Sequence, residues 1–274
     1  QLHGAFALGI IRANEPSRLL AVRQGSPLVV GIGIGENFIS SDQLALLPVT
    51  NRFIYLEEGD FIEVCAKKIT IWNGRGIEVS RPVVELDATL HASSKAGYKH
   101  YMLKEIYEQP LAIERTLAGR VSQGKVAIDA FGPQAATLFA QARHIQILAC
   151  GTSYHAGFVA KYWLEAIAGI SCHVEVASEF RYRTTVLPAD TLLVTISQSG
   201  ETADTLAALR EVKSRALGSL CICNVPTSTL VRESDLAFIT HAGPEIGVAS
   251  TKAFTTQLVA LMLLVLATGR QQGN

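Results

Sequence analysis

Charged residues are scarce in this 274-residue chain, where Asp, Glu, Lys and Arg together make up 18% and hydrophobic residues 49%. The 24 basic side chains equal the 24 acidic ones, so the chain lacks the excess positive charge that nucleic-acid binding requires. We therefore expect no nucleic-acid partner. An apolar and weakly charged composition is typical of an α/β protein whose strands are covered on both faces.

Cysteine is also sparse, and its spacing is irregular. Five cysteines are an odd number and include no CxxC pair, which predicts reduced thiols in a cytoplasmic protein. His155 and His173 lack metal-ligand spacing, and we expect neither a metal ion nor another cofactor. The most apolar run, residues 258–267, is about half of the ~20 residues that a membrane span needs. It predicts a buried core helix, and we expect no membrane partner.

Residues 1–88 carry short apolar runs separated by Gly, Pro and Asn, a spacing that predicts an antiparallel sheet. One helical piece is expected at residues 41–47. Residues 89–98 are small and polar and predict a linker. Because the chain opens with Gln1 in the middle of a sheet-like pattern, we expect a piece of a longer protein. The predicted strands cover residues 5–11, 19–23, 28–32, 53–56, 61–65 and 69–72.

Residues 99–274 have a different rhythm. Two helices are expected first, at 101–109 and 110–120, with Pro110 in the first turn of the second. Apolar strands then alternate with amphipathic helices, which predicts a parallel sheet with helices on both faces. The predicted strands cover residues 144–149, 171–176, 191–196, 219–223 and 236–240. Since ligands bind at the carboxyl ends of such strands, the sequence points to three loops, 150–153, 197–202 and 247–252.

All three loops are rich in hydroxyl groups and glycine, most clearly Ser197-Gln198-Ser199-Gly200-Glu201-Thr202. A helix amino terminus offers unpaired N–H groups and a partial positive charge, and hydroxyls add donors for phosphate oxygens. The pattern predicts a phosphomonoester site built from neutral donors. Ordinary helix capping is the alternative for any one loop, and three such loops at one sheet edge make it the weaker reading. Neither a dinucleotide-binding nor a P-loop fingerprint occurs at a strand-to-helix junction.

Several nearby side chains have two readings from sequence alone. Cys150, at a strand end, is a packed thiol or a nucleophile, and the lack of a partner histidine favours the packed thiol. Glu245 and Lys252 flank the third loop and either reach the substrate or serve as surface and capping charges. Three dense charges form either a buried ion network or a subunit contact: Glu179, Arg181 and Arg183.

Four segments together resemble the first sugar-isomerase (SIS) domain of the glutamine–fructose-6-phosphate aminotransferase family: 150–153, 178–183, 197–205 and 245–255. Residues 1–88 resemble the carboxyl-terminal part of that family's class II glutamine amidotransferase domain, and 100–110 its first isomerase-half helix. The resemblance covers essentially the whole chain. It implies a SIS-type parallel sheet flanked by helices (three-layer α/β/α) in residues 99–274. A partial antiparallel α+β domain of the N-terminal-nucleophile type is expected to precede it.

The resemblance also implies a function, the glutamine-dependent conversion of fructose 6-phosphate to glucosamine 6-phosphate by a cytoplasmic homodimer. The implied phosphate-binding residues are Ser197, Gln198, Ser199 and Thr202, and the implied sugar-binding residues are Thr152, Ser153, Val248 and Ser250. No catalytic residue is expected in this chain. The family's cysteine nucleophile, glutamate base, ring-opening histidine and Schiff-base lysine are expected in segments outside it, so we expect it to be inactive in the full reaction.

Two other functions are weighed against this one. A SIS module that senses a phosphosugar without chemistry would need an effector domain where residues 1–88 stand. A stand-alone phosphosugar isomerase would need the base and the lysine that are expected elsewhere.

Overall fold

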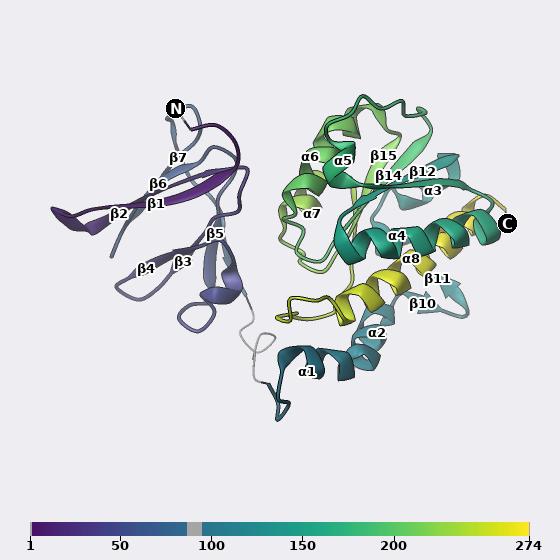
Figure 1. Cartoon of the computed structure of the whole chain (residues 1–274), viewed down its shortest axis with the longest axis horizontal. Helices are drawn as coiled ribbons and strands as arrows, with labels where there is room; N and C mark the ends of the chain where they lie inside the picture. Colours follow the sequence, from purple (N-terminus) through teal and green to yellow (C-terminus); the bar gives the residue numbers. More distant parts are fainter. Residues whose placement is uncertain (1, 87–94, 274) are drawn as a thin grey trace. The chain divides into compact units, whose positions relative to one another are not determined.

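A computed structural model of the chain describes residues 2–86 and 95–273, which form two compact units divided between Ser93 and Ser94. Figure 1 shows the helices and strands of each unit. Of the linker expected at 89–98, residues 89–94 lie outside the described residues.

The first unit contains two antiparallel sheets. Side chains from both sheets, including Ala21 and Ile62 from one and Val30 and Ile54 from the other, form a single buried cluster, so the sheets pack face to face. One sheet runs in the order β1 (Phe6–Arg12), β2 (Glu15–Gln24), β6 (Phe61–Cys65), β7 (Ile69–Trp72), β8 (Glu78–Val79). The other runs in the order β4 (Asn37–Ser40), β3 (Val29–Ile32), β5 (Arg52–Tyr55), β9 (Val83–Glu85).

The predicted antiparallel architecture of this unit is confirmed, with two corrections. The helix expected at 41–47 is a single 3-10 turn at Gln43–Ala45. The strands at 37–40, 78–79 and 83–85 were not predicted, because each has four residues or fewer and lacks an apolar run. Their backbone pairing with neighbouring strands defines them instead.

The second unit is built on a five-stranded parallel sheet in the order β13-β12-β14-β15-β16. All five strands were predicted, and the bounds of the first two are those expected. The central strand β14 is buried along its whole length, as expected of a central parallel strand that is covered on both faces. The strands are β12 (His144–Ala149), β13 (Ser171–Val176), β14 (Thr191–Ser197), β15 (Gly218–Cys223) and β16 (Leu236–Ile239).

Helices cover both faces of this sheet, which confirms the three-layer architecture (Figure 1). Ile147 and Ile196 face one cluster of buried side chains, whereas Leu148 and Leu193 face the other. The first face is covered by α3 (Ala135–Gln141), α4 (Gly151–Trp163) with its π-helical extension Leu164–Ala168, and α8 (Lys252–Gln271). The second is covered by α5 (Ala177–Phe180), α6 (Ala203–Val212) and α7 (Thr229–Glu233).

Two helices, α1 (Tyr101–Tyr107) and α2 (Gln109–Leu117), precede the sheet, and α2 packs against α8. Pro110 lies in the first turn of α2, where its missing N–H costs no hydrogen bond. A short hairpin follows, β10 (Val121–Ser122) with β11 (Lys125–Val126), and was not predicted. Helix α8 is long and apolar enough to cross a membrane, but 67% of its 18-residue apolar window is buried. It is therefore a core helix, as expected.

Candidate functional site

The loops after β12 and β14 are neighbours, because these two strands pair directly and Ala149 lies opposite Ile196. The prediction that residues 150–153 form a loop is wrong, because helix α4 begins within them. Cys150 is the N-cap of α4, and Gly151 begins the helix with a φ of +57°. Thr152 and Ser153 therefore lie in the first helical turn, the first exposed and the second buried. Both predicted residues lie at the same sheet edge as the next loop.

Residues 197–202, which we call the cradle, form a compact turn between β14 and α6. Ser197 Oγ accepts the backbone N–H of Gly200 at 3.0 Å and lies 2.9 Å from Thr202 Oγ1. Ser199 Oγ accepts the N–H of Glu201 at 3.2 Å. The structure thus brings three of the predicted phosphate-binding hydroxyls, Ser197, Ser199 and Thr202, into one turn at the head of α6.

Helix capping does not explain these hydroxyls. Thr202 is the N-cap of α6, yet its side chain makes no capping hydrogen bond. Leu206 makes the first helical bond, to the Thr202 carbonyl at 3.0 Å. Among the described residues, the backbone N–H groups of Ala203, Asp204 and Thr205 have no acceptor. The amino end of α6 therefore keeps the open donors and partial positive charge that favour an anion.

Gly200 lets the cradle pack closely against Ser228 and Cys223. Its φ is +68°, and a Cβ there would lie 2.1 Å from Ser228 Oγ and 2.8 Å from Cys223 Sγ. The Gly200 carbonyl also accepts the N–H of Leu230 at 3.0 Å. The cradle is thus anchored on the end of β15 and the start of α7, an arrangement that any side chain at position 200 would disturb.

Glu201 carries a negative charge inside a predicted anion site. Its Oε1 accepts the N–H of Thr229 at 2.7 Å, at the start of α7. Its Oε2 is buried without a partner among the described residues. The carboxylate is thus engaged by the neighbouring loop, which gives it a structural contact within the cradle's support.

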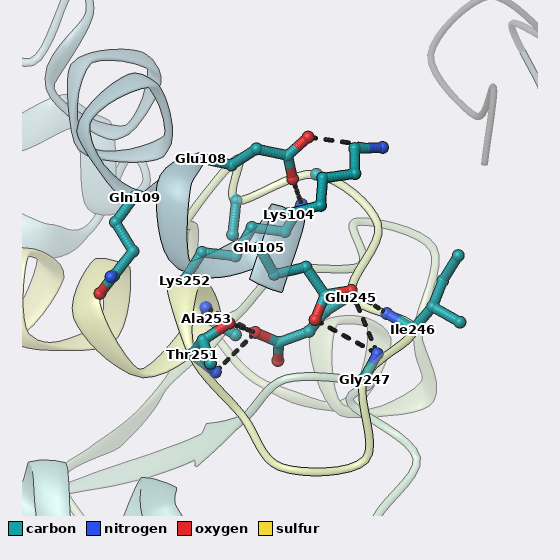
Figure 2. Close-up of polar contacts among 12 residues, drawn as sticks. Lys104, Glu105, Glu108, Gln109, Glu245, Ile246, Gly247, Thr251, Lys252 and Ala253 are labelled. Atoms are coloured by element: carbon teal, nitrogen blue, oxygen red, sulfur yellow. Dashed lines mark hydrogen bonds and ion pairs between the residues drawn. The ribbon is translucent and has the colours of Figure 1, made fainter. Parts of the chain in front are cut away.

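The third predicted loop differs from the cradle, because a carboxylate already occupies the amino end of its helix (Figure 2). Glu245 Oε1 accepts the N–H groups of Thr251 at 2.8 Å and Ala253 at 3.1 Å. Its Oε2 accepts the Ser250 hydroxyl at 3.0 Å. Of the two readings for Glu245, the structure gives it a capping role on α8. The hydroxyls of this loop donate to Glu245, so they are not the open donors expected from sequence.

Two carboxylates from α1 and its C-cap hold the same loop and helix from the other side (Figure 2). Glu105, which is 2% exposed, accepts the N–H groups of Ile246 at 2.6 Å and Gly247 at 3.1 Å. Glu108 pairs with the buried Lys252 at 2.6 Å. Burial raises the pKa of Glu108, but the hydrogen bond and charge of Lys252 outweigh it and leave that pKa lowered. Lys252 is therefore a buried ion-pair partner, which is neither the substrate contact nor the surface or capping charge expected from sequence.

Asn224 joins the cradle to Ala242 and Gly243, which precede the third loop, and sequence reasoning missed it. Its backbone N–H donates to the Gln198 carbonyl at 3.3 Å. Its side chain donates to the Gly243 carbonyl at 2.8 Å and accepts the N–H of Ala242 at 2.7 Å. Its place directly after β15 was the available signal, because side chains after parallel strands lie at the ligand-binding edge. The predicted Gln198 and the segment leading to Val248 and Ser250 are thus linked through one side chain.

The remaining candidates are structural. Arg181 pairs with Asp204 at 2.8 Å, and Arg183 pairs with Glu175, but these side chains are half-buried or exposed, so the pairs do not form the buried ion network of the first reading. Burial raises the pKa of Cys221 to about 12, as expected of a packed thiol.

The Val248 side chain is fully exposed. In the two described ranges, no group of three His, Cys, Asp or Glu residues is placed to hold a metal ion.

The chain is similar to known proteins along its whole length. Residues 138–267 match the family model of the SIS domain. The chain is 62% identical to the glutamine–fructose-6-phosphate aminotransferase (isomerizing) of Pseudomonas putida and 58% identical to that of Yersinia pseudotuberculosis. Both matches cover the whole of this chain but 45% of the relative, so the chain spans less than half the length of these relatives.

Solved structures show the same relationship for the second unit. The carboxyl-terminal domain of glucosamine-fructose-6-phosphate aminotransferase from Francisella tularensis is 58% identical. It superposes with a TM-score of 0.64 over 66% of this chain and 51% of that one. A putative phosphosugar isomerase from Silicibacter pomeroyi is 27% identical, with a TM-score of 0.54 over 62% of this chain and 50% of the other.

Proposed function

We propose that this chain, a SIS-domain homologue of the glutamine–fructose-6-phosphate aminotransferases, holds the sugar phosphate on which that reaction acts. The observation that carries the proposal is the amino end of α6. Three backbone N–H groups, which have no acceptor in the part of the chain that the structure describes, stand beside the hydroxyls of Ser197, Ser199 and Thr202. This arrangement suits a phosphate group, which has oxygen acceptors and a negative charge.

In this proposal the phosphate of fructose 6-phosphate lies in the cradle, with Gln198 contributing beside the three hydroxyls. The sugar extends toward the residues on the neighbouring segments, Thr152, Ser153, Val248 and Ser250. Their position at the same sheet edge supports it, since α4 begins beside the cradle and Asn224 links Gln198 to Gly243, on the segment that leads to the third loop.

The full reaction is the glutamine-dependent formation of glucosamine 6-phosphate from fructose 6-phosphate. We assign none of the described residues the acid–base or covalent steps of that reaction, so the chain alone binds the sugar phosphate without turning it over. The whole-length similarity includes residues 1–93 and favours this function over a SIS module that only senses a phosphosugar. We place the protein in the cytoplasm, in keeping with five free cysteines. We also propose that it forms a homodimer, as the resemblance to the aminotransferase family implies.

Isothermal titration calorimetry with fructose 6-phosphate tests the cradle. The double variant Ser199→Ala/Thr202→Ala removes two hydroxyls, each worth roughly 1.5–3 kcal/mol in a hydrogen bond to a charged group. The two losses together predict binding at least about 100-fold weaker than for the wild type. Ser214→Ala is the matched control, because this exposed serine lies past the opposite end of α6. Equal affinity for the wild type and the double variant contradicts the proposal.

A coupled assay for glucosamine 6-phosphate tests the second part. With fructose 6-phosphate and glutamine present, the chain alone is expected to give no product above the rate without protein. Sustained product formation would show that the described residues include the catalytic groups.

A further inference from the structure

The carboxylate of Glu245 is fixed in one orientation. Two backbone N–H groups, those of Thr251 and Ala253, donate to its Oε1 at 2.8 and 3.1 Å. Its Oε2 faces the Ser250 hydroxyl at 3.0 Å. A carboxylate accepts hydrogen bonds and has no hydrogen to give, so the hydrogen of this contact belongs to Ser250.

This contact determines whether the Ser250 hydroxyl donates or accepts a hydrogen bond when a ligand binds. A serine hydroxyl has one donor and two lone pairs, and the donor is already used on Glu245. The remaining lone pairs accept a hydrogen bond. A sugar hydroxyl can supply one, whereas a phosphate dianion cannot. Thr251 is oriented in the same way, because its hydroxyl also donates to Glu245, at 3.3 Å.

We propose that Glu245 is a positioning residue that makes Ser250 a hydrogen-bond acceptor for a hydroxyl group of the sugar. The proposal rests on the function proposed above, and it divides the substrate between two helix ends. The open amino end of α6 takes the phosphate. The amino end of α8, already neutralised by Glu245, takes the hydroxyl-bearing end of the sugar.

The surroundings of Glu245 keep this orientation in place. On its carboxyl-terminal side, Glu105 holds the N–H groups of Ile246 and Gly247. On its amino-terminal side, Asn224 holds Ala242 and Gly243. The segment between β16 and α8 is thus anchored on both sides of the carboxylate, so Ser250 meets a ligand with its lone pairs already directed by Glu245.

Glu245→Gln reverses the polarity of Ser250 while keeping the shape of the side chain. The amide oxygen must stay at the Oε1 position, since two N–H donors point there. The amide nitrogen then replaces Oε2 and donates to Ser250, whose own hydrogen turns outward. We expect fructose 6-phosphate to bind this variant roughly fivefold to tenfold more weakly, the loss that one hydrogen bond predicts.

Three comparisons in the same calorimetric series make the test specific. Ser250→Ala is expected to lose the same factor, and Glu245→Gln/Ser250→Ala no more than either single variant. Inorganic phosphate, which needs only the cradle, is expected to bind Glu245→Gln and the wild type within about twofold of each other. Glu233→Gln is the charge-matched control, because its carboxylate pairs with Arg210 away from this loop. It is expected to bind fructose 6-phosphate like the wild type.

The outcomes separate this inference from the proposed function. If Ser250→Ala or Glu245→Gln binds fructose 6-phosphate like the wild type, the role of Glu245 is wrong and the cradle still stands. If the wild type fails to bind fructose 6-phosphate, the proposed function itself fails.

A ligand-side test needs no variant and applies even if Glu245→Gln is unstable. Singly deoxyfluorinated fructose 6-phosphates replace one hydroxyl with fluorine, which cannot donate. One of them is expected to bind the wild type more weakly by the same factor and to lose nothing further on Ser250→Ala. If every analogue that binds more weakly loses further affinity on Ser250→Ala, or if none binds more weakly, the inference is overturned.

Discussion

The carboxylate of Glu105 accepts the backbone N–H of Gly247 with both oxygens, at 3.1 and 3.2 Å, across 142 residues of sequence. Glu105 is buried on α1, and the same carboxylate also takes the N–H of Ile246. Helix α1 therefore stabilises the position of the loop that leads to Val248 and Ser250.

Glu105→Ala is expected to lower the free energy of unfolding of the second unit by about 1–3 kcal/mol, because it leaves two N–H groups without their acceptor. Fructose 6-phosphate should also bind more weakly, since the loop loses the hydrogen bonds that fix its position. Urea unfolding measures the first effect and calorimetry the second. Glu114→Ala, on the exposed side of α2, is the control and should resemble the wild type in both. A Glu105→Ala protein that unfolds at the wild-type urea concentration would contradict this role.

Gly200→Ala is expected to abolish sugar-phosphate binding. The backbone there has a φ of +68°, which strains an alanine by about 1–3 kcal/mol, and the new Cβ overlaps Ser228 and Cys223. Gly124→Ala is a matched control, because Gly124 has a φ of +72° but open space around it. Calorimetry with fructose 6-phosphate should find the control unaffected. Equal binding by both variants would show that the close approach at Gly200 does not matter.

Much of the fold followed from the sequence, because local patterns specify it. Strands β12 and β13 have the expected bounds, and the alternation of strands with helices predicted the parallel sheet. Hydroxyls and Gly200 after β14 located the cradle. The beginning of α4 was misplaced because Gly151, with a positive φ, reads as a loop residue and yet starts the helix.

The polar contacts around the cradle could not be predicted in the same way. Glu105 meets Gly247 and Lys252 meets Glu108 over more than 140 residues, and no local pattern records such a pair. The sequence also could not show that Ser199 accepts a hydrogen bond within the protein whereas Ser250 donates one. Both are hydroxyls before a helix, and only the three-dimensional position of Glu245 shows that Ser250 is already a donor.

The pair of Glu108 and Lys252 predicts an acid-sensitive second unit. The folded-state pKa of Glu108 is lowered, so its stabilising contribution is fully present above the unfolded pKa, about 4.5. It is lost as pH falls through the lower folded value. Urea unfolding of the wild type between pH 7 and pH 3 should therefore show a steeper loss of stability below pH 4.5 than Glu108→Gln shows. The variant should also be less stable at pH 7, where Lys252 lacks its partner. Parallel pH profiles would contradict the ion-pair account.

The cysteines should separate into two reactivity classes. Burial raises the pKa of Cys172 and Cys221 to about 12 and also raises that of Cys223, so very little thiolate forms near pH 8. Cys65 and Cys150 are only half-buried. Titration with a colorimetric disulfide reagent should label these two first, and the other three only after unfolding in urea.

Cys150 gives a further readout, because it is the N-cap of α4 beside the cradle. Saturating fructose 6-phosphate should slow its labelling, while Cys65, in the first unit, provides an internal control at an unchanged rate. Five thiols that react at one common rate in the native protein would contradict both expectations.

The central claim is that phosphate binds at the amino end of α6 and not at that of α8. Amide chemical shifts of the ¹⁵N-labelled chain, followed during titration with fructose 6-phosphate and then with inorganic phosphate, test it directly. The account predicts that both ligands shift the amides of Ala203, Asp204 and Thr205 most strongly. Inorganic phosphate should leave Thr251 and Ala253 in place, since their N–H groups are held by Glu245. Unchanged amides at 203–205, or a dominant phosphate response at Thr251 and Ala253, would contradict it.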